Sequence, residues 1–349
     1  MNHEREVLLK TVIRPPALSQ GDAIGYFSPS SPATAYAPKR YARARAYLQS
    51  KGFRLVSGSL SGLSDGYRSG TIEARADELN ALLRNPDVRC VMSTIGGANS
   101  NSLLPYLDYD ALARDPKIVI GYSDATAILL AIHQMTGLVT FYGPALVASL
   151  GEMSPLVDQT YSGFESLLMG GASSPYRYEM PVSWTDEFIP WETQTQAKSL
   201  RPNAWSFHGT GCVTGRLMGG NLNTMWGIWG SPYMPEIRDG DVLLIEDSLK
   251  SIATVERLFA FLKVNGVFDR VSAVLLGKHE LFDDMETGRR PIEVLREVLA
   301  GQPVPVVEGF DCCHTHPMLT VPIGCTVRVN FDEERVVTEA QWLDGAAER

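Results

Sequence analysis

A serine on a predicted strand-to-helix turn is the first residue of this sequence that could act as a nucleophile. Residues 118–124 read Ile-Val-Ile-Gly-Tyr-Ser-Asp and precede a helical pattern. Such a turn holds the serine away from the sheet, and the next backbone N–H can stabilise an oxyanion. The usual Gly-x-Ser-x-Gly pattern is incomplete, because Ala125 replaces the second glycine. Ser123 is therefore a candidate nucleophile, and the alternative is that Ser123 and Asp124 form a simple helix cap.

A carboxylate stands at the end of a short apolar run in the second half of the chain. Residues 241–245 predict a buried strand, and Glu246 follows them directly. Ligands of open α/β sheets lie at the carboxyl ends of strands. A carboxylate at that place can orient a histidine by accepting its ring N–H. The alternative is that Glu246 or Asp247 caps the helix that follows.

A loop between two strand-like runs contains the candidate general base. Residues 310–317 read Phe-Asp-Cys-Cys-His-Thr-His-Pro, and His314 is the candidate. His316, which precedes a proline, and His279, which follows another predicted strand, are the competitors. The two adjacent cysteines beside two histidines could indicate a metal, but no second Cys-x-x-Cys or histidine pair completes a ligand set, so we expect no metal.

The three candidates occur in the chain order Ser123, Glu246, His314. Acyl-transfer chemistry needs these three residue types: a nucleophile, a base that accepts its proton and a carboxylate that fixes the tautomer of the base. The order alone is weak evidence, because any long chain contains many such triples.

The first half of the chain predicts a frame that could position the serine. Short apolar runs alternate with helical patterns, which is typical of a mainly parallel sheet with helices on its faces. The expected strands are residues 23–27, 53–56, 88–95, 117–120 and 138–142, and the expected helices are residues 38–51, 71–85 and 124–135.

The second half predicts another α/β unit. Its expected strands are residues 241–245, 271–276 and 304–307, its helices are 251–264 and 291–300, and a hairpin joins 326–330 to 335–338. Residues 151–205, rich in proline and tryptophan, show no such pattern and read as a linker with a functional loop. We therefore divide the chain into an N-terminal domain with the serine (1–165), a linker and substrate loop (166–206) and a C-terminal domain with the glutamate and histidine (207–349).

Composition narrows the class of partner. The 349 residues include 31 basic and 40 acidic side chains, a formal charge of −9, so neither a nucleic acid polymer nor an anionic membrane is an expected partner. No apolar run approaches the roughly 20 residues of a membrane span. Residues 1–10 are charged and do not predict a signal peptide. The five cysteines are irregularly spaced, which suits reduced thiols and a cytoplasmic location.

Several motifs resemble the LD-carboxypeptidase family of serine peptidases, and the likeness extends from Ile24 to Val329. The motifs are Gly121-Tyr122-Ser123-Asp124, Gly219-Gly220-Asn221-Leu222, Ile245-Glu246-Asp247-Ser248 and His314-Thr315-His316-Pro317 with Pro322-Ile323-Gly324. Residues 94–106 and 277–280 are most similar to the MccF-like branch, which contains the microcin C self-immunity proteins.

The resemblance implies a fold and a catalytic centre. A Ser–Glu–His triad would be Ser123, Glu246 and His314, with an oxyanion hole formed by the backbone N–H groups of Gly97 and Asp124. The expected fold is α/β, with an N-terminal flavodoxin-like, mainly parallel sheet carrying helices on both faces. A smaller C-terminal α/β domain with β-hairpin content completes it. The site would lie between the domains, and the family implies a homodimer.

One departure from the family pattern bears on the substrate. The cell-wall branch typically carries Gly-Gly-Tyr-Gly with an arginine shortly after it, whereas residues 96–101 read Gly-Gly-Ala-Asn-Ser-Asn. This favours the immunity branch, whose members hydrolyse the amide between an aminoacyl or peptidyl group and a nucleotide-like moiety and so detoxify aminoacyl-adenylate mimics. The alternatives are a muropeptide LD-carboxypeptidase of cell-wall recycling and a binding protein that kept the fold without the activity.

Five further residues are candidates for binding such a substrate. Trp184 and Trp191 offer flat faces for a nucleobase, or else pack the linker on the core. Asn221 and Asn223 could bind an acidic side chain of the scissile residue, or simply form a turn. Lys250 could neutralise a phosphate or sulfamoyl group, or lie in solvent. The chain has no P-loop or dinucleotide motif, so we expect no ATP, NAD or other cofactor.

Overall fold

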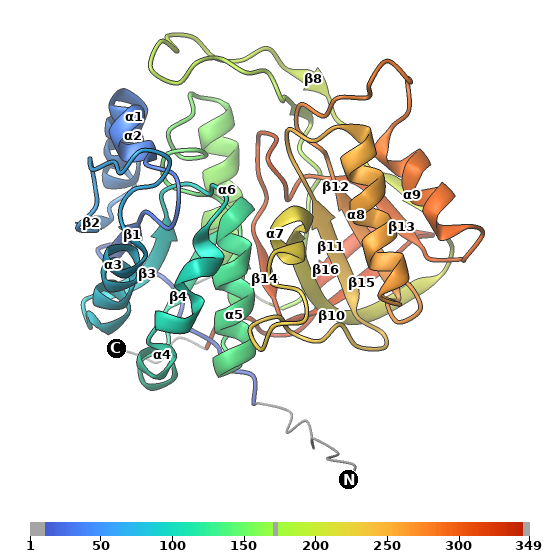
Figure 1. Ribbon diagram of the computed structural model, residues 1–349, viewed down its shortest axis with the longest axis horizontal. Coiled ribbons are helices and arrows are strands. Elements are labelled where there is room, and N and C mark those ends of the chain that lie inside the picture. The colour runs from blue at the N-terminus through green and yellow to red at the C-terminus, as the bar shows by residue number, and fades with distance from the viewer. Residues whose placement is uncertain (1–10, 170–173, 345–349) are drawn as a thin grey trace.

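Two β-sheets organise the computed structural model, which describes residues 11–169 and 174–344 (Figure 1). The first sheet has the order β14-β5-β4-β3-β1-β2. Five of its strands are parallel: β1 (Ala23–Phe27), β2 (Arg54–Ser57), β3 (Val88–Ser93), β4 (Ile118–Gly121) and β5 (Thr140–Tyr142). Their order, 2-1-3-4-5, is that of flavodoxin-like folds. The expected mainly parallel sheet is confirmed.

Helices cover both faces of this sheet because successive strand residues point to opposite sides. Val91 and Val119 pack against one set of helices, and Cys90 and Ile118 pack against the other. The first set is α3 (Ile72–Arg84), α4 (Tyr109–Arg114) and α5 (Thr126–Thr136), and the second is α2 (Pro38–Ser50) and α6 (Leu156–Leu168). A short helix, α1 (Ala33–Tyr36), precedes α2.

The second sheet has eight strands in the order β6-β16-β15-β10-β11-β12-β13-β9. The long strand β10 (Cys212–Asn221) joins its two parts: the first half pairs antiparallel with β15, and the second half pairs parallel with β11. The other strands are β6 (Tyr176–Arg177), β9 (Ser206–His208), β11 (Val242–Glu246), β12 (Ala273–Gly277), β13 (Val306–Phe310), β15 (Thr326–Asn330) and β16 (Arg335–Thr338). Three helices accompany them: α7 (Leu222–Trp226), α8 (Ile252–Val264) and α9 (Pro291–Leu299).

We call the first sheet with its helices the first lobe, and the second sheet with its helices the second lobe. The C-terminal part of the chain returns to the first lobe at two places. Strand β14 (Val321–Ile323) pairs antiparallel with β5 and so extends the first sheet. Further on, the buried indole of Trp342 donates a hydrogen bond of 2.7 Å to the Leu167 carbonyl at the end of α6. One hydrophobic core runs through both lobes, with α5 of the first and β11 of the second in the same cluster. The two lobes are therefore packed against each other through a shared hydrophobic core.

The predicted strands and helices are present, with ends that differ by at most three residues. The predicted helix 124–135 begins as a 3-10 turn, Ser123–Ala125, before α5 starts at Thr126. The segment without a pattern, 151–205, contains the 13-residue helix α6. Within the described ranges, no helix is long and apolar enough to cross a membrane.

Candidate active site

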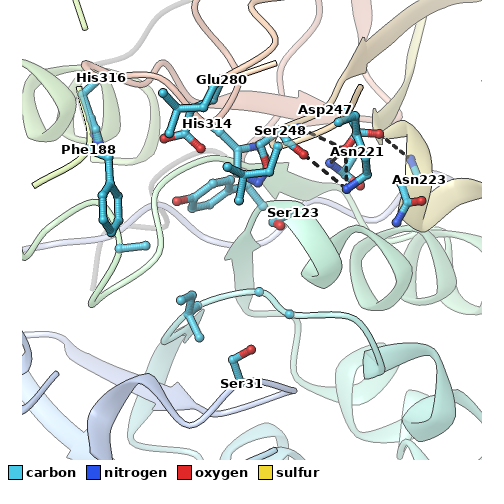
Figure 2. A pocket seen from close by; sticks show the side chains of 18 of the residues that line it. Ser31, Ser123, Phe188, Asn221, Asn223, Asp247, Ser248, Glu280, His314 and His316 are labelled. Atoms are coloured by element: carbon cyan, nitrogen blue, oxygen red, sulfur yellow. Dashed lines mark hydrogen bonds and ion pairs between the residues drawn. The ribbon is translucent and has the colours of Figure 1, made fainter. Parts of the chain in front are cut away.

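A cavity of about 600 Å³ lies at the carboxyl ends of β4 and β11, where the two lobes meet. Segments from both lobes and from the loop between them form its wall (Figure 2). Seven of the lining residues were candidates on sequence grounds: Gly97, Ser123, Trp191, Asn221, Asn223, Lys250 and His314. The cavity therefore collects residues from distant parts of the chain, from Ser31 near its start to His316 near its end.

Ser123 occupies a strained turn at the end of β4. Its φ angle is +60°, a left-handed conformation that residues with a side chain rarely adopt. The backbone N–H of Ser123 donates to the Tyr142 hydroxyl over 3.1 Å. A Cβ added to Gly96 would lie 2.7 Å from the Ser123 Oγ, so only glycine allows the neighbouring loop to approach the hydroxyl this closely. No side chain caps the N-terminus of α5. The alternative that Ser123 and Asp124 form a helix cap is therefore wrong.

Glu246 and His314 form a buried pair beside this turn. The His314 Nδ1 and the Glu246 Oε2 are 2.5 Å apart. The other carboxylate oxygen accepts hydrogen bonds from the Tyr142 hydroxyl at 2.6 Å and from the Asn221 amide at 3.0 Å. Tyr142 therefore connects the backbone of Ser123 to the carboxylate that holds His314.

Burial and charge act in opposite directions on this pair. Burial alone would raise the pKa of Glu246, but the His314 imidazole and the hydrogen bonds from Tyr142 and Asn221 hold that pKa below its ordinary value. Burial alone would lower the pKa of His314, but the Glu246 carboxylate more than offsets this, and the pKa of His314 is raised. A histidine whose protonated form is stabilised by a carboxylate in this way is suited to act as a general base.

The loop that contains Gly97 is fixed against the serine turn by polar contacts. The Asp124 carboxylate accepts hydrogen bonds from the backbone N–H groups of Asn99 at 2.9 Å and Ser100 at 2.8 Å. The Ser30 hydroxyl accepts another from the N–H of Ala98 at 3.0 Å. A Cβ added to Gly96 would lie 2.9 Å from the backbone nitrogen of Asp124. The loop that contains Gly96 and the turn that contains the serine are therefore in close contact.

The competing histidines lack a carboxylate partner of this kind. His316 is buried, its Nδ1 has no hydrogen-bond partner among the described residues, and burial lowers its pKa to about 3. His279 is buried too, and its Nδ1 lies 3.2 Å from the Gly277 carbonyl; burial lowers its pKa. Glu246 therefore distinguishes His314 from both.

Neither Glu246 nor Asp247 caps the helix that follows them. Helix α8 is capped by Ser251, whose hydroxyl accepts the N–H of Thr254. The Asp247 carboxylate instead accepts the N–H of Asn223 at 3.1 Å, at the start of α7. The sequence alternative of a simple cap is therefore wrong for both carboxylates.

The predicted substrate-binding residues differ in how far their side chains are accessible to a ligand in the cavity. Asn221 is almost fully buried, and its amide donates to Glu246 and Asp247 while its oxygen accepts from Thr224, so its contacts are internal. Asn223 is half-buried and lines the cavity. Lys250 also lines it; its Nζ is 3.5 Å from the Asp247 carboxylate and donates to a backbone carbonyl.

The two tryptophans of the substrate loop lie in different surroundings. Trp191 lines the cavity, and the Tyr36 ring stacks on it with 6.1 Å between centroids. Trp184 is not among the lining residues: it lies on the hairpin strand β7 (Ser183–Trp184), with the Arg201 guanidinium 4.4 Å from its ring centre. A contact between substrate and Trp184 remains a prediction.

Buried charges anchor the substrate loop to the first lobe. In Figure 1 this loop, between β7 and β8 (Arg201–Pro202), arches over the top of the molecule. Arg40 of α2 pairs with Glu152 at 3.0 Å, and Lys198 of the loop pairs with the same carboxylate at 3.2 Å. Arg40 also donates to Gln194 at 2.8 Å. These residues carry no recognisable signal in the sequence, because an isolated charged residue does not indicate that it is buried.

We expect that replacing Glu152 by alanine will destabilise the protein by about 3 kcal/mol or more, because the buried Arg40 and Lys198 would lose their counter-ion. Denaturant unfolding of Glu152→Ala against the wild type measures this. As a control, Glu333→Ala removes the carboxylate of an exposed pair with Arg335 and should cost less than about 1 kcal/mol. Equal losses from both variants would contradict the anchoring role.

Tyr142 and Glu280 were not among the candidates chosen from the sequence. Tyr142 ends β5 inside a buried apolar strand, where a tyrosine is normally a packing residue. Glu280 follows β12 by three positions and lines the cavity. Its position after a buried strand, the same signal that selected Glu246, would have identified it.

Comparison with known proteins places this geometry in a family context. Residues 24–143 match the LD-carboxypeptidase N-terminal domain, and residues 214–329 match the LD-carboxypeptidase C-terminal domain. A carboxypeptidase homologue of Vibrio cholerae is 63% identical over 327 residues, 94% of this chain and 98% of that protein. The microcin C7 self-immunity protein MccF of Escherichia coli is 57% identical over 328 residues, 93% of this chain and 95% of that protein.

Solved structures give the same result. MccF in complex with aspartyl sulfamoyl adenosine superimposes with a TM-score of 0.94 at 56% identity, over 95% of this chain and 100% of that chain. MccF in complex with glutamyl sulfamoyl guanosine superimposes with a TM-score of 0.93 at 56% identity, over 95% and 99% of the two chains.

Proposed function

Because the chain belongs to the LD-carboxypeptidase family, we propose that it is a serine hydrolase that cleaves the amide between an aminoacyl or peptidyl group and a nucleotide-like moiety. Such an activity destroys mimics of aminoacyl-adenylates and confers self-immunity to antibiotics of the microcin C type. The observation that carries the proposal is that His314, paired with the buried Glu246, lines the same cavity as Ser123.

The reaction follows from the roles that the geometry allows. Ser123 attacks the amide carbonyl while His314 accepts its proton, and Glu246 holds the imidazole and stabilises its charged form. The N–H groups of Gly97 and Asp124 hold the oxyanion. His314 then returns the proton to the leaving nitrogen, which releases the nucleotide-like part. Water attacks the acyl-enzyme with His314 as base, and the free acid leaves.

The cavity suits a substrate with an acyl part and a nucleoside part. Its volume of about 600 Å³ lies in the usual range for small-molecule sites. Trp191 offers an aromatic surface for the base, and Asn223 and Lys250 offer a hydrogen-bond donor and a positive charge for an anionic group. MccF, with aspartyl and glutamyl sulfamoyl nucleosides bound, supports this choice of ligand.

Hydrolysis of a panel of aminoacyl sulfamoyl nucleosides, followed by mass spectrometry, tests the proposal. We expect release of the amino acid and the sulfamoyl nucleoside from the aspartyl and glutamyl members. A muropeptide with a tetrapeptide stem, assayed in parallel, tests the alternative of a cell-wall carboxypeptidase. Turnover of the tetrapeptide alone would reverse our choice. No turnover of either, together with ligand-induced stabilisation, would instead indicate a binding protein.

We expect that replacing Trp191 by alanine will raise KM for aspartyl sulfamoyl adenosine by about 5- to 100-fold, because stacking of a base contributes ~1–3 kcal/mol. The kcat value should change little, since the residue does not touch the reacting atoms. Steady-state kinetics measure both constants. Trp226→Ala, which removes a half-exposed tryptophan outside the cavity wall, is the matched control. An unchanged KM in Trp191→Ala would exclude stacking on this ring.

We also propose that the protein acts in the cytoplasm as a homodimer. The five cysteines are free thiols and four of them are buried, which suits a reducing compartment. The dimer rests on the family resemblance. Light scattering coupled to size-exclusion chromatography tests it, and a monomer at micromolar concentration would contradict it.

A further inference from the structure

Both backbone polar groups of Ser123 are bound by hydroxyl groups that also contact the second lobe. The N–H of Ser123 donates to the Tyr142 hydroxyl at 3.1 Å, and its carbonyl accepts the Thr126 hydroxyl at 2.6 Å. The Tyr142 hydroxyl in turn donates to Glu246 at 2.6 Å. The Thr126 oxygen accepts the backbone N–H of Asn221 at 3.1 Å. Two hydrogen-bonded paths therefore connect the strained turn of the first lobe to the ends of β10 and β11 in the second lobe.

The direction of the hydrogen bonds at Tyr142 follows from the chemistry of its two neighbours. A carboxylate only accepts hydrogen bonds and a backbone N–H only donates one, so the single proton of the hydroxyl points to Glu246. Burial and the charge of Glu246 raise the pKa of Tyr142 well above its ordinary value, and the hydroxyl therefore keeps this proton near neutral pH. The positive end of the O–H dipole thus faces the carboxylate that stabilises protonated His314.

The Gly219-Gly220 motif leaves room for these two side chains. The φ angle of Gly220 is +144°, and a Cβ added there would lie 2.8 Å from the Thr126 Cγ2 and 2.9 Å from the Tyr142 Cε2. Any other residue at this position would push the two side chains away from the second sheet. Tyr142 and Thr126 are fully buried and do not line the cavity, so they can affect the reaction only through the residues that they bind.

We propose that the hydroxyl groups of Tyr142 and Thr126 position the nucleophile: they hold the Ser123 turn in register with the carboxylate–histidine pair of the second lobe. The inference rests on the proposed function, since it assumes that Ser123 attacks with His314 as its base. A residue with a side chain keeps a left-handed conformation only where its surroundings fix it. Here both of its backbone polar groups are fixed from the lobe that carries the base, so the nucleophile and the base keep their relative positions.

Two variants test the hydroxyl groups, because Tyr142→Phe and Thr126→Val each remove one hydroxyl and keep the shape of the side chain. Each should lower kcat for aspartyl sulfamoyl adenosine about 10- to 100-fold, since a buried partner is left without its hydrogen bond. KM should change little, because neither residue lines the cavity. Thr126→Ser keeps the hydroxyl and should retain most of the wild-type kcat. Losses confined to KM, or a Thr126→Ser protein as slow as Thr126→Val, would contradict positioning by these groups.

The pH profile separates the two hydroxyl groups. Only the Tyr142 hydroxyl binds Glu246, and its O–H dipole opposes the charge by which that carboxylate favours protonated His314. In Tyr142→Phe the pKa of His314 should therefore rise and the acidic limb of kcat/KM should move to higher pH, whereas in Thr126→Val it should stay in place. A limb that stays or moves to lower pH in Tyr142→Phe would overturn the role of its hydroxyl. Both variants leave the other ionisable groups around the imidazole unchanged: Asp247, Glu280, Tyr122, His279 and His316.

Tyr178→Phe is the matched control for the loss of a buried hydroxyl. The Tyr178 hydroxyl is buried, lies 2.8 Å from the Thr338 hydroxyl and does not line the cavity. Its removal should lower the melting temperature much as Tyr142→Phe does, while kcat and the acidic limb keep their wild-type values. If Tyr178→Phe lowers kcat as far as Tyr142→Phe does, the loss reflects stability, and a positioning role is contradicted.

The rate at which a fluorophosphonate probe labels Ser123 distinguishes this inference from the proposed function, because the probe needs the nucleophile and its base but no particular substrate. Labelling of Tyr142→Phe and Thr126→Val that is about tenfold slower than that of the wild type supports the inference, even where aspartyl sulfamoyl adenosine is not hydrolysed. Equal rates in all three proteins would overturn the inference and leave the hydrolase assignment in place. A wild type that is not labelled would overturn both.

Discussion

Replacing Ser123 by alanine is expected to lower kcat for aspartyl sulfamoyl adenosine by about 10⁴-fold or more. The substitution removes the Oγ that forms the acyl-enzyme and leaves the backbone contacts of the turn, including the N–H bond to Tyr142. Residual turnover would come from binding and the oxyanion hole, which act on water without the nucleophile. The fold should persist, because the Ser123 hydroxyl makes no hydrogen bond to other described residues that would be lost.

Steady-state rates, thermal unfolding and covalent labelling test this together. A fluorophosphonate probe should label the wild type at Ser123, as read by peptide mass spectrometry, and should leave Ser123→Ala unlabelled. Ser64→Ala, at an exposed serine that does not line the cavity, is the matched control. A Ser123→Ala protein that retains more than about 1% of turnover would show that another nucleophile carries the reaction.

Local signals selected the three catalytic candidates, and the family resemblance joined them into a predicted triad. Each candidate is marked by a segment of about eight residues. The serine and the glutamate each follow a buried strand, and the histidine lies in a loop. The alternation of strands and helices likewise predicts a parallel sheet, and the right-handed crossover rule limits its strand order. That Ser123 and His314 line one cavity could not be seen locally, since it depends on how β4 and the loop after β13, which belong to two different sheets, are arranged.

The features that escaped prediction depend on contacts between distant residues. Strand β14 has three residues and pairs with β5 across about 180 positions, so it carries no pattern of its own. Helix α6 begins directly after Pro155 inside a segment rich in proline, where composition argues for a loop. Trp184 and Trp191 have the same residue type in the same loop, and only the fold decides that Trp191 lines the cavity.

Replacing Glu246 by glutamine should lower kcat by about 10⁴-fold and also shift the pH dependence. The amide keeps the size of the side chain but can present its NH₂ to His314, which favours the wrong tautomer. Catalysis needs neutral His314, so kcat/KM falls as pH drops through its pKa. Glu246 raises that pKa, and the acidic limb of the wild-type profile should therefore lie above pH 6.5, the ordinary value for histidine.

In Glu246→Gln the acidic limb should move to lower pH. Burial, which favours neutral imidazole, remains, while the largest opposing charge is gone; Glu280 and Asp247 still raise the pKa of His314, but by less. Profiles of kcat/KM between about pH 5 and 8 measure the shift, with Glu286→Gln as the charge-matched control, which should keep the wild-type limb. A limb that stays in place or moves to higher pH in Glu246→Gln would contradict the assignment of this carboxylate to His314, because removing the partner of an imidazolium has to make protonation harder.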